Sequence, residues 1–486
     1  MKKAINTNKC RKILIVTAFC FVVTFIMLLH LNVFSKVDDI HNATEKIMTA
    51  YRIPACAVVQ YKNSELNFDN YGKSHGAEIS DSSLFVLGST TKAFTGLAIQ
   101  MIADDGYINL DENISDYIPW LQFIYKGEKT DITIRQLLSH SSGIPYKTLY
   151  NLPSGDYDGV IEKSVQAING IKLDFAPGSE YQYVNMNYTI LAYLLEIVTG
   201  KSYESYIQEN ILLPLEMNNT YLYMNQTNQK VTFVNGSRTF LGCITEYNAE
   251  LEGANKPAGG MITCTADLSK WIKAQMGEPS VPDKLKNAIA RTHDISQCAY
   301  TPQNGDDYYL FGWHISVDGE KIMHTGGIQN YGSCVMIDLK NRTAVATLCN
   351  SMLSPAIYIA ENYIASLQGA DKYNISFVSV ATLDIICSFI CLLLLYFIIN
   401  MVLKVIKVKS TLAKTSSLII KTILLFCISI VLACLPYLIG YTYAMLWKWS
   451  AMTMIFSIIE GILLCVLKIY FNVSLLWKQT LRNSIK

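Results

Sequence analysis

The pattern of apolar and polar positions divides the chain into a mixed central part and strongly apolar ends. Residues 13–35 contain no Asp, Glu, Lys or Arg, and three further apolar runs close the chain. These runs cover roughly residues 375–402, 416–440 and 451–467. Because about 20 mainly apolar residues are enough for a helix to cross the hydrocarbon core of a bilayer, four membrane spans are predicted.

The first apolar run is either an uncleaved anchor or a signal peptide. Five basic residues precede it, and it is longer than the ~7–15 apolar residues of a typical signal core. Val33 and Ser35 are nevertheless small enough to precede a cleavage site. The sequence favours an anchor and leaves the signal peptide open.

Basic residues around the apolar runs predict their orientation. The loop at 404–414 carries four Lys and the segment after residue 467 carries three Lys and one Arg, whereas the loop at 441–450 carries only Lys448. Cytoplasmic loops are enriched in Lys and Arg. We therefore expect a multi-pass protein of the cell membrane with cytoplasmic termini, an extracytoplasmic central part and membrane lipid as a partner.

Three ionisable residues, Asp384, Lys421 and Glu460, lie inside the predicted spans. Placing such groups in hydrocarbon costs at least a few kcal/mol, so they should face neighbouring helices or a cavity. Packing between helices is the favoured interpretation, and a polar groove for a partner or substrate is the alternative. The C-terminal helices would then either serve only as an anchor or also recruit an exporter or an immunity partner.

Strand-like patterns lie at both ends of the central part, and helical patterns fill its middle. A helix at 38–51 is followed by a strand at 55–61 and a second short strand ending near Tyr71. At the far end, four strands and a closing helix are predicted at 309–317, 320–324, 333–339, 343–348 and 355–368. Helical spacing of apolar residues is found at 92–103, 132–138, 190–198 and 203–213.

This order of elements predicts an α+β fold. An antiparallel sheet would form from both ends of the domain and be flanked by helices, with an all-helical subdomain inserted between them. We expect three parts: an anchor or signal peptide at 1–36, the extracytoplasmic domain at 37–372, and three transmembrane helices with a cytoplasmic tail at 373–486. The cleft between the sheet and the inserted helices is the expected functional site.

Composition narrows the function classes. The chain has 486 residues with 40 Lys and Arg against 39 Asp and Glu, but residues 36–372 alone carry 25 against 37. This composition excludes disorder and a fibrous repeat, and we expect no nucleic-acid partner. The cysteines lack the paired spacing of a zinc site and no His-Glu-x-x-His motif occurs, so we expect no metal or organic cofactor. Whether any of the cysteines form disulfides is left open by the sequence.

The first candidate for chemistry is Ser89, which begins the segment Ser-Thr-Thr-Lys after an apolar stretch. Ser89 would lie at the N-terminus of a helix, with Lys92 one turn further on. A partly desolvated lysine amine can be neutral enough to take the proton of a serine hydroxyl. The helix dipole and the amide of Ser89 would also favour the oxyanion that forms when the hydroxyl attacks a carbonyl.

Two further elements could complete a site. Tyr183 and Asn185 follow a Pro-Gly turn and are expected on a loop tip, where a phenol could relay a proton and an amide could hold a substrate carbonyl. The strand Ile-Met-His-Thr-Gly-Gly places His324 and Thr325 where they could meet a carboxylate or carbonyl. The amide of Gly327 could be a second oxyanion donor. Each of these patterns is common when taken singly.

Together and in this order, the motifs Ser89-x-x-Lys92, Tyr183-x-Asn185 and His324-Thr325-Gly326 resemble the serine β-lactamase and penicillin-binding-protein superfamily, most closely its class-C-like peptidase branch. The resemblance spans about residues 38–366 and implies a β-lactamase-like fold. It implies that Ser89 is the acylated nucleophile and that Lys92 and Tyr183 handle protons. It further implies that Asn185 binds substrate and that the amides of Ser89 and Gly327 form the oxyanion hole. His140, in the segment Ser-His-Ser-Ser-Gly, is interpreted as a structural loop histidine.

Two departures from the family pattern bear on substrate. His324 stands where many penicillin-recognising members carry lysine, which weakens the case for binding a β-lactam or D-Ala-D-Ala carboxylate. The three C-terminal spans resemble those of membrane-bound peptidases that remove an N-acyl-D-asparagine leader from peptide prodrugs. That subgroup carries serine at the position of Asn185.

Three functional hypotheses follow. The leading one is a membrane-anchored serine hydrolase that acts through an acyl-enzyme on an amide next to a D-amino acid, in a cell-wall peptide or a secreted prodrug. A β-lactamase or esterase of the same fold is the second. The third is a sensor that is acylated on Ser89 without turnover and signals through its helices.

Overall fold

The structure is a computed structural model. It describes residues 37–74, 76–151, 153, 155–222, 232–248, 252–302, 306–351, 356–373, 380–406, 415–438, 443, 446–447 and 452–484. The predicted span at 13–35 lies outside the described residues.

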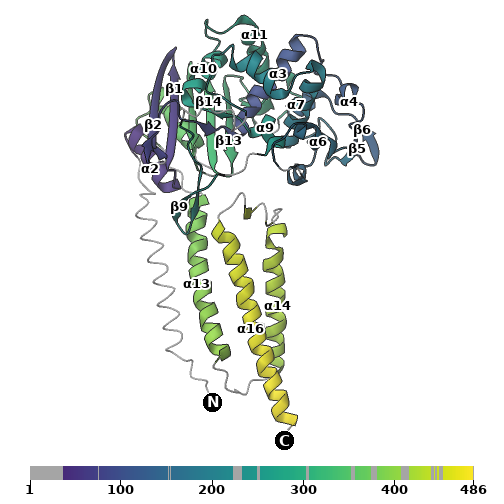
Figure 1. Ribbon diagram of the computed structural model, residues 1–486, viewed down its shortest axis with the longest axis vertical. Helices are drawn as coiled ribbons and strands as arrows, with labels where there is room; N and C mark the ends of the chain where they lie inside the picture. Colours follow the sequence, from purple (N-terminus) through teal and green to yellow (C-terminus); the bar gives the residue numbers. More distant parts are fainter. Residues whose placement is uncertain are drawn as a thin grey trace.

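An eight-stranded antiparallel sheet forms from both ends of the central part (Figure 1). In spatial order its strands are β11 (Tyr308–Leu310), β12 (Trp313–Ile315), β13 (Lys321–Ile328), β14 (Tyr331–Asp338), β15 (Thr343–Cys349), β1 (Ala55–Lys62), β2 (Glu65–Ser74) and β3 (Ala77–Glu78). β1 pairs with β15, so that Cys56 lies opposite Cys349 although the two residues are far apart in sequence. The sequence prediction of a sheet built from both ends of the domain is confirmed.

Each face of the sheet packs against its own hydrophobic core, because successive side chains along a strand point to opposite faces. On β1, Ala57 and Val59 join a large core, whereas Cys56 and Val58 join a smaller one. The smaller core is closed by α2 (Ile40–Tyr51) and α12 (Ala356–Leu367). The large core includes residues of α3 (Lys92–Asp104), α10 (Thr265–Gln275) and α11 (Asp283–Thr292).

The inserted middle part is mainly helical and lies beside the sheet. Its helices are α4 (Ile114–Tyr117), α5 (Ile134–Leu138), α6 (Val160–Gln166), α7 (Asn185–Thr199), α8 (Tyr203–Ile207) and α9 (Lys256–Gly259). It also carries a small sheet of β5 (Phe123–Tyr125), β6 (Glu128–Thr130) and β7 (Ile171–Lys172). Two pairs of short strands lie outside these sheets: β4 (Phe85–Val86) pairs with β10 (Ile262–Thr263), and β8 (Ser237–Phe240) pairs with β9 (Cys243–Glu246).

Two predicted elements differ in detail. The strand expected at 309–317 is split into β11 and β12, because Phe311 and Gly312 adopt φ of 49° and 84° and turn the chain. The helix expected at 203–213 is α8 followed by a wider π-helical turn at Gln208–Leu212.

The β11–β12 turn packs directly on the backbone of α3. A Cβ at Gly96 would lie 2.2 Å from the carbonyl oxygen of Phe311, and a Cβ at Gly312 would lie 2.3 Å from the backbone of Lys92. Only glycine permits so close an approach of two backbones. These two glycines therefore fix the start of α3 against the sheet.

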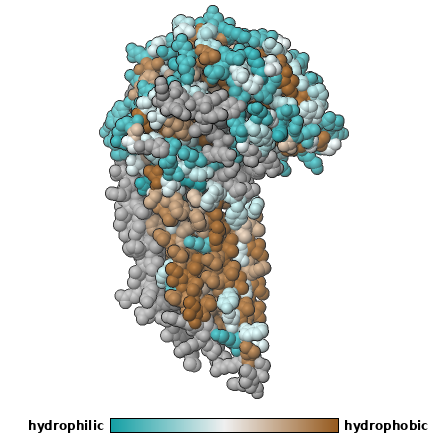
Figure 2. Space-filling model, in the orientation of Figure 1, coloured by the Kyte–Doolittle hydropathy of each residue, from teal (hydrophilic) through white to brown (hydrophobic). Residues whose placement is uncertain are grey.

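Three long apolar helices close the chain: α13 (Val380–Ile406), α14 (Thr415–Leu438) and α16 (Met452–Ser484). Each is long and apolar enough to span a membrane. They extend side by side from one end of the α+β domain, and their surface is predominantly hydrophobic (Figures 1 and 2). The hairpin β8–β9 reaches from the domain to the first turns of α13.

Candidate active site

The candidate nucleophile lies on a tight turn between strand and helix. Ser89 is in the 3₁₀ turn η1 (Gly88–Thr91), and Lys92 is the first residue of α3. Gly88 has a φ of 62°, and a Cβ there would lie 2.8 Å from the amide nitrogen of Gly327. Glycine at this position lets the turn that carries Ser89 pack against β13.

Lys92 is fully buried, and its amine has no carboxylate partner among the described residues. Nζ donates a hydrogen bond of 2.7 Å to the carbonyl oxygen of Ala258. It also lies 4.7 Å from the centroid of the Tyr183 ring and 5.8 Å from that of Tyr188. Burial without a counter-charge lowers the pKa of Lys92 well below its ordinary value. The amine is therefore suited to accept a proton.

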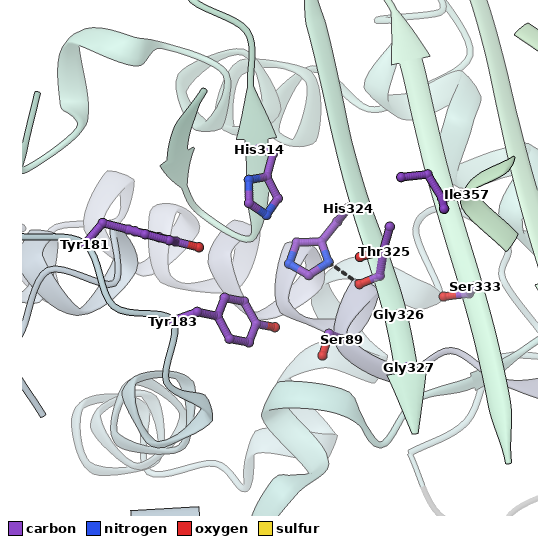
Figure 3. A pocket seen from close by; sticks show the side chains of 10 residues that line it. All are labelled: Ser89, Tyr181, Tyr183, His314, His324, Thr325, Gly326, Gly327, Ser333 and Ile357. Carbon is purple, nitrogen blue, oxygen red and sulfur yellow. Dashed lines mark hydrogen bonds between the residues drawn. The ribbon is translucent and has the colours of Figure 1, made fainter. Parts of the chain in front are cut away.

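Tyr183 points its hydroxyl toward Ser89 (Figure 3). Its buried Oη has no hydrogen-bond partner in the described part of the chain. Burial raises the pKa of Tyr183 above its usual value, and the nearby hydroxyl of Ser89 offsets part of that rise. At neutral pH the phenol keeps its proton and can pass protons between Ser89 and Lys92.

Asn185 does not lie on a loop tip as the sequence suggested. It is the first residue of α7, which begins after Val184 in extended conformation. Its side-chain Oδ1 is buried and makes no hydrogen bond to other described residues, and Asn185 does not line the cavity beside Ser89. The structure brings Ser89 and Tyr183 together in the cavity, whereas Asn185 and Lys92 are not among the residues that line it.

The loop histidine His140 lies beside Tyr183. Its ring centroid is 4.4 Å from that of Tyr183. Its Nδ1 accepts from the side chain of Asn187 at 2.9 Å and from the amide of Val184 at 3.3 Å. These bonds hold the segment that carries Tyr183, which fits the structural role expected for His140.

His324 is only 2% exposed and is held at both ring nitrogens. Nδ1 lies 2.6 Å from the carbonyl oxygen of Thr325, so Nδ1 carries the proton, and Nε2 accepts from the hydroxyl of Tyr309 at 2.9 Å. Burial, followed by the nearby Lys92 amine and His314, lowers the pKa of His324 well below its ordinary value. The ring is therefore neutral and differs from a permanent cation at this position.

The end of β13 packs on the nucleophile turn. A Cβ at Gly326 would lie 2.1 Å from the carbonyl oxygen of Leu87 and 2.2 Å from Oγ of Ser333. Ser333 Oγ donates to the same carbonyl at 2.6 Å. Nothing lies within 4 Å of a Cβ at Gly327, so this residue faces open space beside Ser89. The amides of Ser89 and Gly327 are suited to form an oxyanion hole.

These groups surround a cavity of about 560 Å³. It is lined by Ser89, Tyr181, Tyr183, His314, His324, Thr325, Gly326, Gly327, Ser333 and Ile357 (Figure 3). No Lys or Arg is among them. Thr325 is exposed and contributes its side chain to the rim. Among the described residues, no group of three or more His, Cys, Asp and Glu could hold a metal ion.

Four lining residues were not predicted from the sequence: Tyr181, His314, Ser333 and Ile357. Of these four, only His314 could have been noticed in the sequence, because it is a polar residue between Trp313 and Ile315 in a predicted strand. Burial lowers the pKa of His314, and its ring centroid is 5.6 Å from that of His324. Tyr181 stacks obliquely on Tyr300 and Tyr309, so aromatic rings form one wall of the cavity.

Comparisons with known proteins bear on the family and the fold of the domain that holds this cavity. Residues 40–369 match the family model described as Beta-lactamase. Protein flp of Staphylococcus aureus (strain MRSA252) is 30% identical over 306 residues, which cover 61% of this chain and 60% of that protein. Unguisins hydrolase ungD' of Aspergillus campestris is 26% identical over 353 residues, covering 65% of this chain and 62% of that protein.

The chain spans about three fifths of the length of these curated relatives. Among solved structures, the octameric penicillin-binding protein homologue from Pyrococcus abyssi has a similar fold, with a TM-score of 0.59 and 23% identity. That match covers 68% of this chain and 77% of the homologue. Because the family match extends over more than half of the chain and coincides with the domain that holds Ser89, the protein belongs to the beta-lactamase family.

Proposed function

We propose that the protein is a membrane-anchored serine hydrolase that acts through an acyl-enzyme on Ser89. The observation that carries the proposal is the Lys92 amine, which is buried without a carboxylate partner one helical turn from Ser89. Such an amine is neutral at a pH where an exposed lysine is charged, and a neutral amine can activate a hydroxyl.

The mechanism follows from the positions of these groups. Ser89 Oγ attacks the substrate carbonyl carbon, and its proton passes to Lys92 Nζ, directly or through Tyr183 Oη. The oxyanion accepts hydrogen bonds from the amides of Ser89 and Gly327. When the tetrahedral intermediate collapses, the bond to the leaving group breaks and the proton returns to that group. Water then hydrolyses the acyl-enzyme by the same route.

The cavity favours an uncharged group beside the scissile bond. Its lining residues include no permanent cation, and both histidines in it have lowered pKa values because they are buried. A substrate carboxylate would lose its hydration there without gaining a charged partner. We therefore infer an amide or ester substrate, next to a D-amino acid as the family resemblance suggests, in a cell-wall peptide or a secreted prodrug.

A second candidate, an esterase, is favoured by the same neutral cavity, whereas a β-lactamase would require a carboxylate to be held there. For the rest of the chain we propose the division into residues 1–36, 37–372 and 373–486. The catalytic domain would lie on the extracytoplasmic face of the cell membrane. The distribution of Lys and Arg and the three long apolar helices support this topology.

Replacing the nucleophile tests the proposal directly. Ser89→Ala is expected to fold as the wild type does and to lower turnover of acyl-D-amino-acid amides and esters by about a thousandfold or more, because no acyl-enzyme can form. Turnover is measured on the purified full chain in detergent, with circular dichroism as the check on folding. Ser115→Ala, at a serine that bonds Asp131 away from the cavity, is the control. Undiminished turnover in Ser89→Ala would rule out the proposed nucleophile.

The pH dependence of the reaction should report the Lys92 amine. Because burial lowers the pKa of Lys92, the amine is protonated and inactive only at low pH, and kcat/KM should rise with pH and level off well below pH 10.5. Lys92→Arg, which keeps the charge, should be inactive at every pH. His324→Gln should retain the rise, since His324 is already neutral. Loss of the rise in His324→Gln would assign it to the histidine.

Matched substrates test the neutral cavity. Two acyl-D-amino-acid substrates that differ only in a carboxamide or a carboxylate on the leaving group should differ by about tenfold or more in kcat/KM, in favour of the carboxamide. The difference corresponds to about 1.4 kcal/mol, which is within the cost of desolvating an unpaired charge. Equal rates, or a preference for the carboxylate, would show that a cation reaches the bound substrate.

A further inference from the structure

The hairpin β8–β9 joins the catalytic domain to the long apolar helices. Its turn is formed by Leu241 and Gly242, which adopt φ of 52° and 73°. Figure 1 shows the hairpin reaching from the domain to the start of α13. The first three residues of β8 are buried, which is unusual for a protruding hairpin and reflects contacts at both of its ends.

Asp384 of α13 holds the outer end of this hairpin. One of its carboxylate oxygens accepts from the amide of Gly242 at 2.8 Å, and the other accepts from Thr453 Oγ1 of α16 at 2.7 Å. Asp384 is fully buried. A buried carboxylate among apolar helices is costly unless its oxygens are satisfied, and here the catalytic domain supplies one of the two donors.

Further contacts join the hairpin to residues of the C-terminal region. The guanidinium of Arg238 donates to the carbonyl oxygen of Trp447 at 3.0 Å and lies over the rings of Tyr247 and Trp447, at 4.6 and 5.7 Å from their centroids. The rings of Phe240 and Phe456 lie 5.6 Å apart. The hairpin is therefore held by hydrogen bonds, a cation–π contact and an aromatic contact.

The inner end of the hairpin holds the turn between β13 and β14. The hydroxyl of Tyr247 donates to Gln329 Oε1 at 3.0 Å, and the side chain of Asn330 donates to the carbonyl oxygen of Tyr247. Asn330 is fully buried, and a Cβ at Gly236 would lie 1.9 Å from its Nδ2. Gln329 and Asn330 follow the Gly327 amide by only two and three residues. A continuous set of contacts therefore links Asp384 to the oxyanion-hole strand.

We propose that Asp384 is a positioning residue of the active site. Through Gly242 and the hairpin it fixes the β13–β14 turn, and with it the amide of Gly327 relative to Ser89. The C-terminal helices are then a part of the enzyme as well as its anchor. The inference rests on the proposed function, because it assumes that Ser89 is acylated and that Gly327 binds the oxyanion. Donors of this kind act only when held within about 0.5 Å of their productive position.

The test compares three variants of the full chain in lipid nanodiscs. Asp384→Leu removes both hydrogen bonds, and Asp384→Asn keeps an acceptor for Gly242 and a donor for Thr453. Ser457→Ala removes a hydroxyl of α16 that bonds the carbonyl oxygens of Cys387 and Thr453 and contacts the Sγ of Cys391, but does not contact the hairpin. The readouts are kcat and KM for a chromogenic acyl-D-amino-acid ester, with near-ultraviolet circular dichroism and thermal unfolding as checks on folding.

Asp384→Leu is expected to lower kcat by about tenfold or more with KM within about twofold, because the oxyanion contact forms in the transition state. Asp384→Asn should restore most of the activity, and Ser457→Ala should resemble the wild type. An unchanged kcat in folded Asp384→Leu overturns the proposal. A kcat loss that Asp384→Asn does not rescue, or that Ser457→Ala reproduces, assigns the effect to general helix packing and also overturns it.

A second variant decides the matter if Asp384→Leu does not fold. Tyr247→Phe keeps the ring beneath Arg238 and removes only the bond to Gln329, so it loosens the β13–β14 turn without touching the helices. It should lower kcat several-fold at similar KM, and wild-type kcat overturns the proposal. Failure of the proposed function can be told apart from failure of this inference, because in the first case the wild type itself would not be acylated at Ser89.

Discussion

The site depends on one buried lysine amine that lacks a counter-charge. Lys92 is sealed under the aromatic wall of the cavity, and its amine is met by the carbonyl oxygen of Ala258 and the faces of two tyrosine rings. Burying such an amine costs free energy, and the protein recovers it only by leaving the amine neutral. The close backbone contact between Gly312 and Lys92 fixes the start of α3 against the sheet. Packing is thus what makes the amine of this lysine suited to act as a base.

The burial that lowers the pKa of Lys92 also explains why the histidines of the cavity are neutral. His324 is held by Thr325 and Tyr309 and is buried, so a positive charge on its ring would be desolvated, and a protonated Lys92 amine would also repel it. A permanent cation at this position would instead give the cavity a fixed positive charge. With a neutral histidine the cavity offers no such partner, which under the proposed function narrows the substrates that it can accept.

Local sequence was enough to predict much of the fold and the site, because the signals act over a few residues. The apolar spacing of 92–103 and the serine before it placed Ser89 and Lys92 at a helix start. Contacts between residues far apart in the sequence could not be predicted in this way. The hydrogen bond from Gly242 to Asp384 joins residues about 140 positions apart, and it depends on how the helices dock on the hairpin.

The most direct test of the central claim is mass spectrometry of the full chain, quenched in acid within milliseconds to seconds of mixing with an acyl-D-amino-acid ester. The account predicts a mass increase equal to the acyl group, located by digestion on the peptide that contains Ser89 and absent from Ser89→Ala. An acyl group on another residue, or an equal mass increase in Ser89→Ala, would contradict the account.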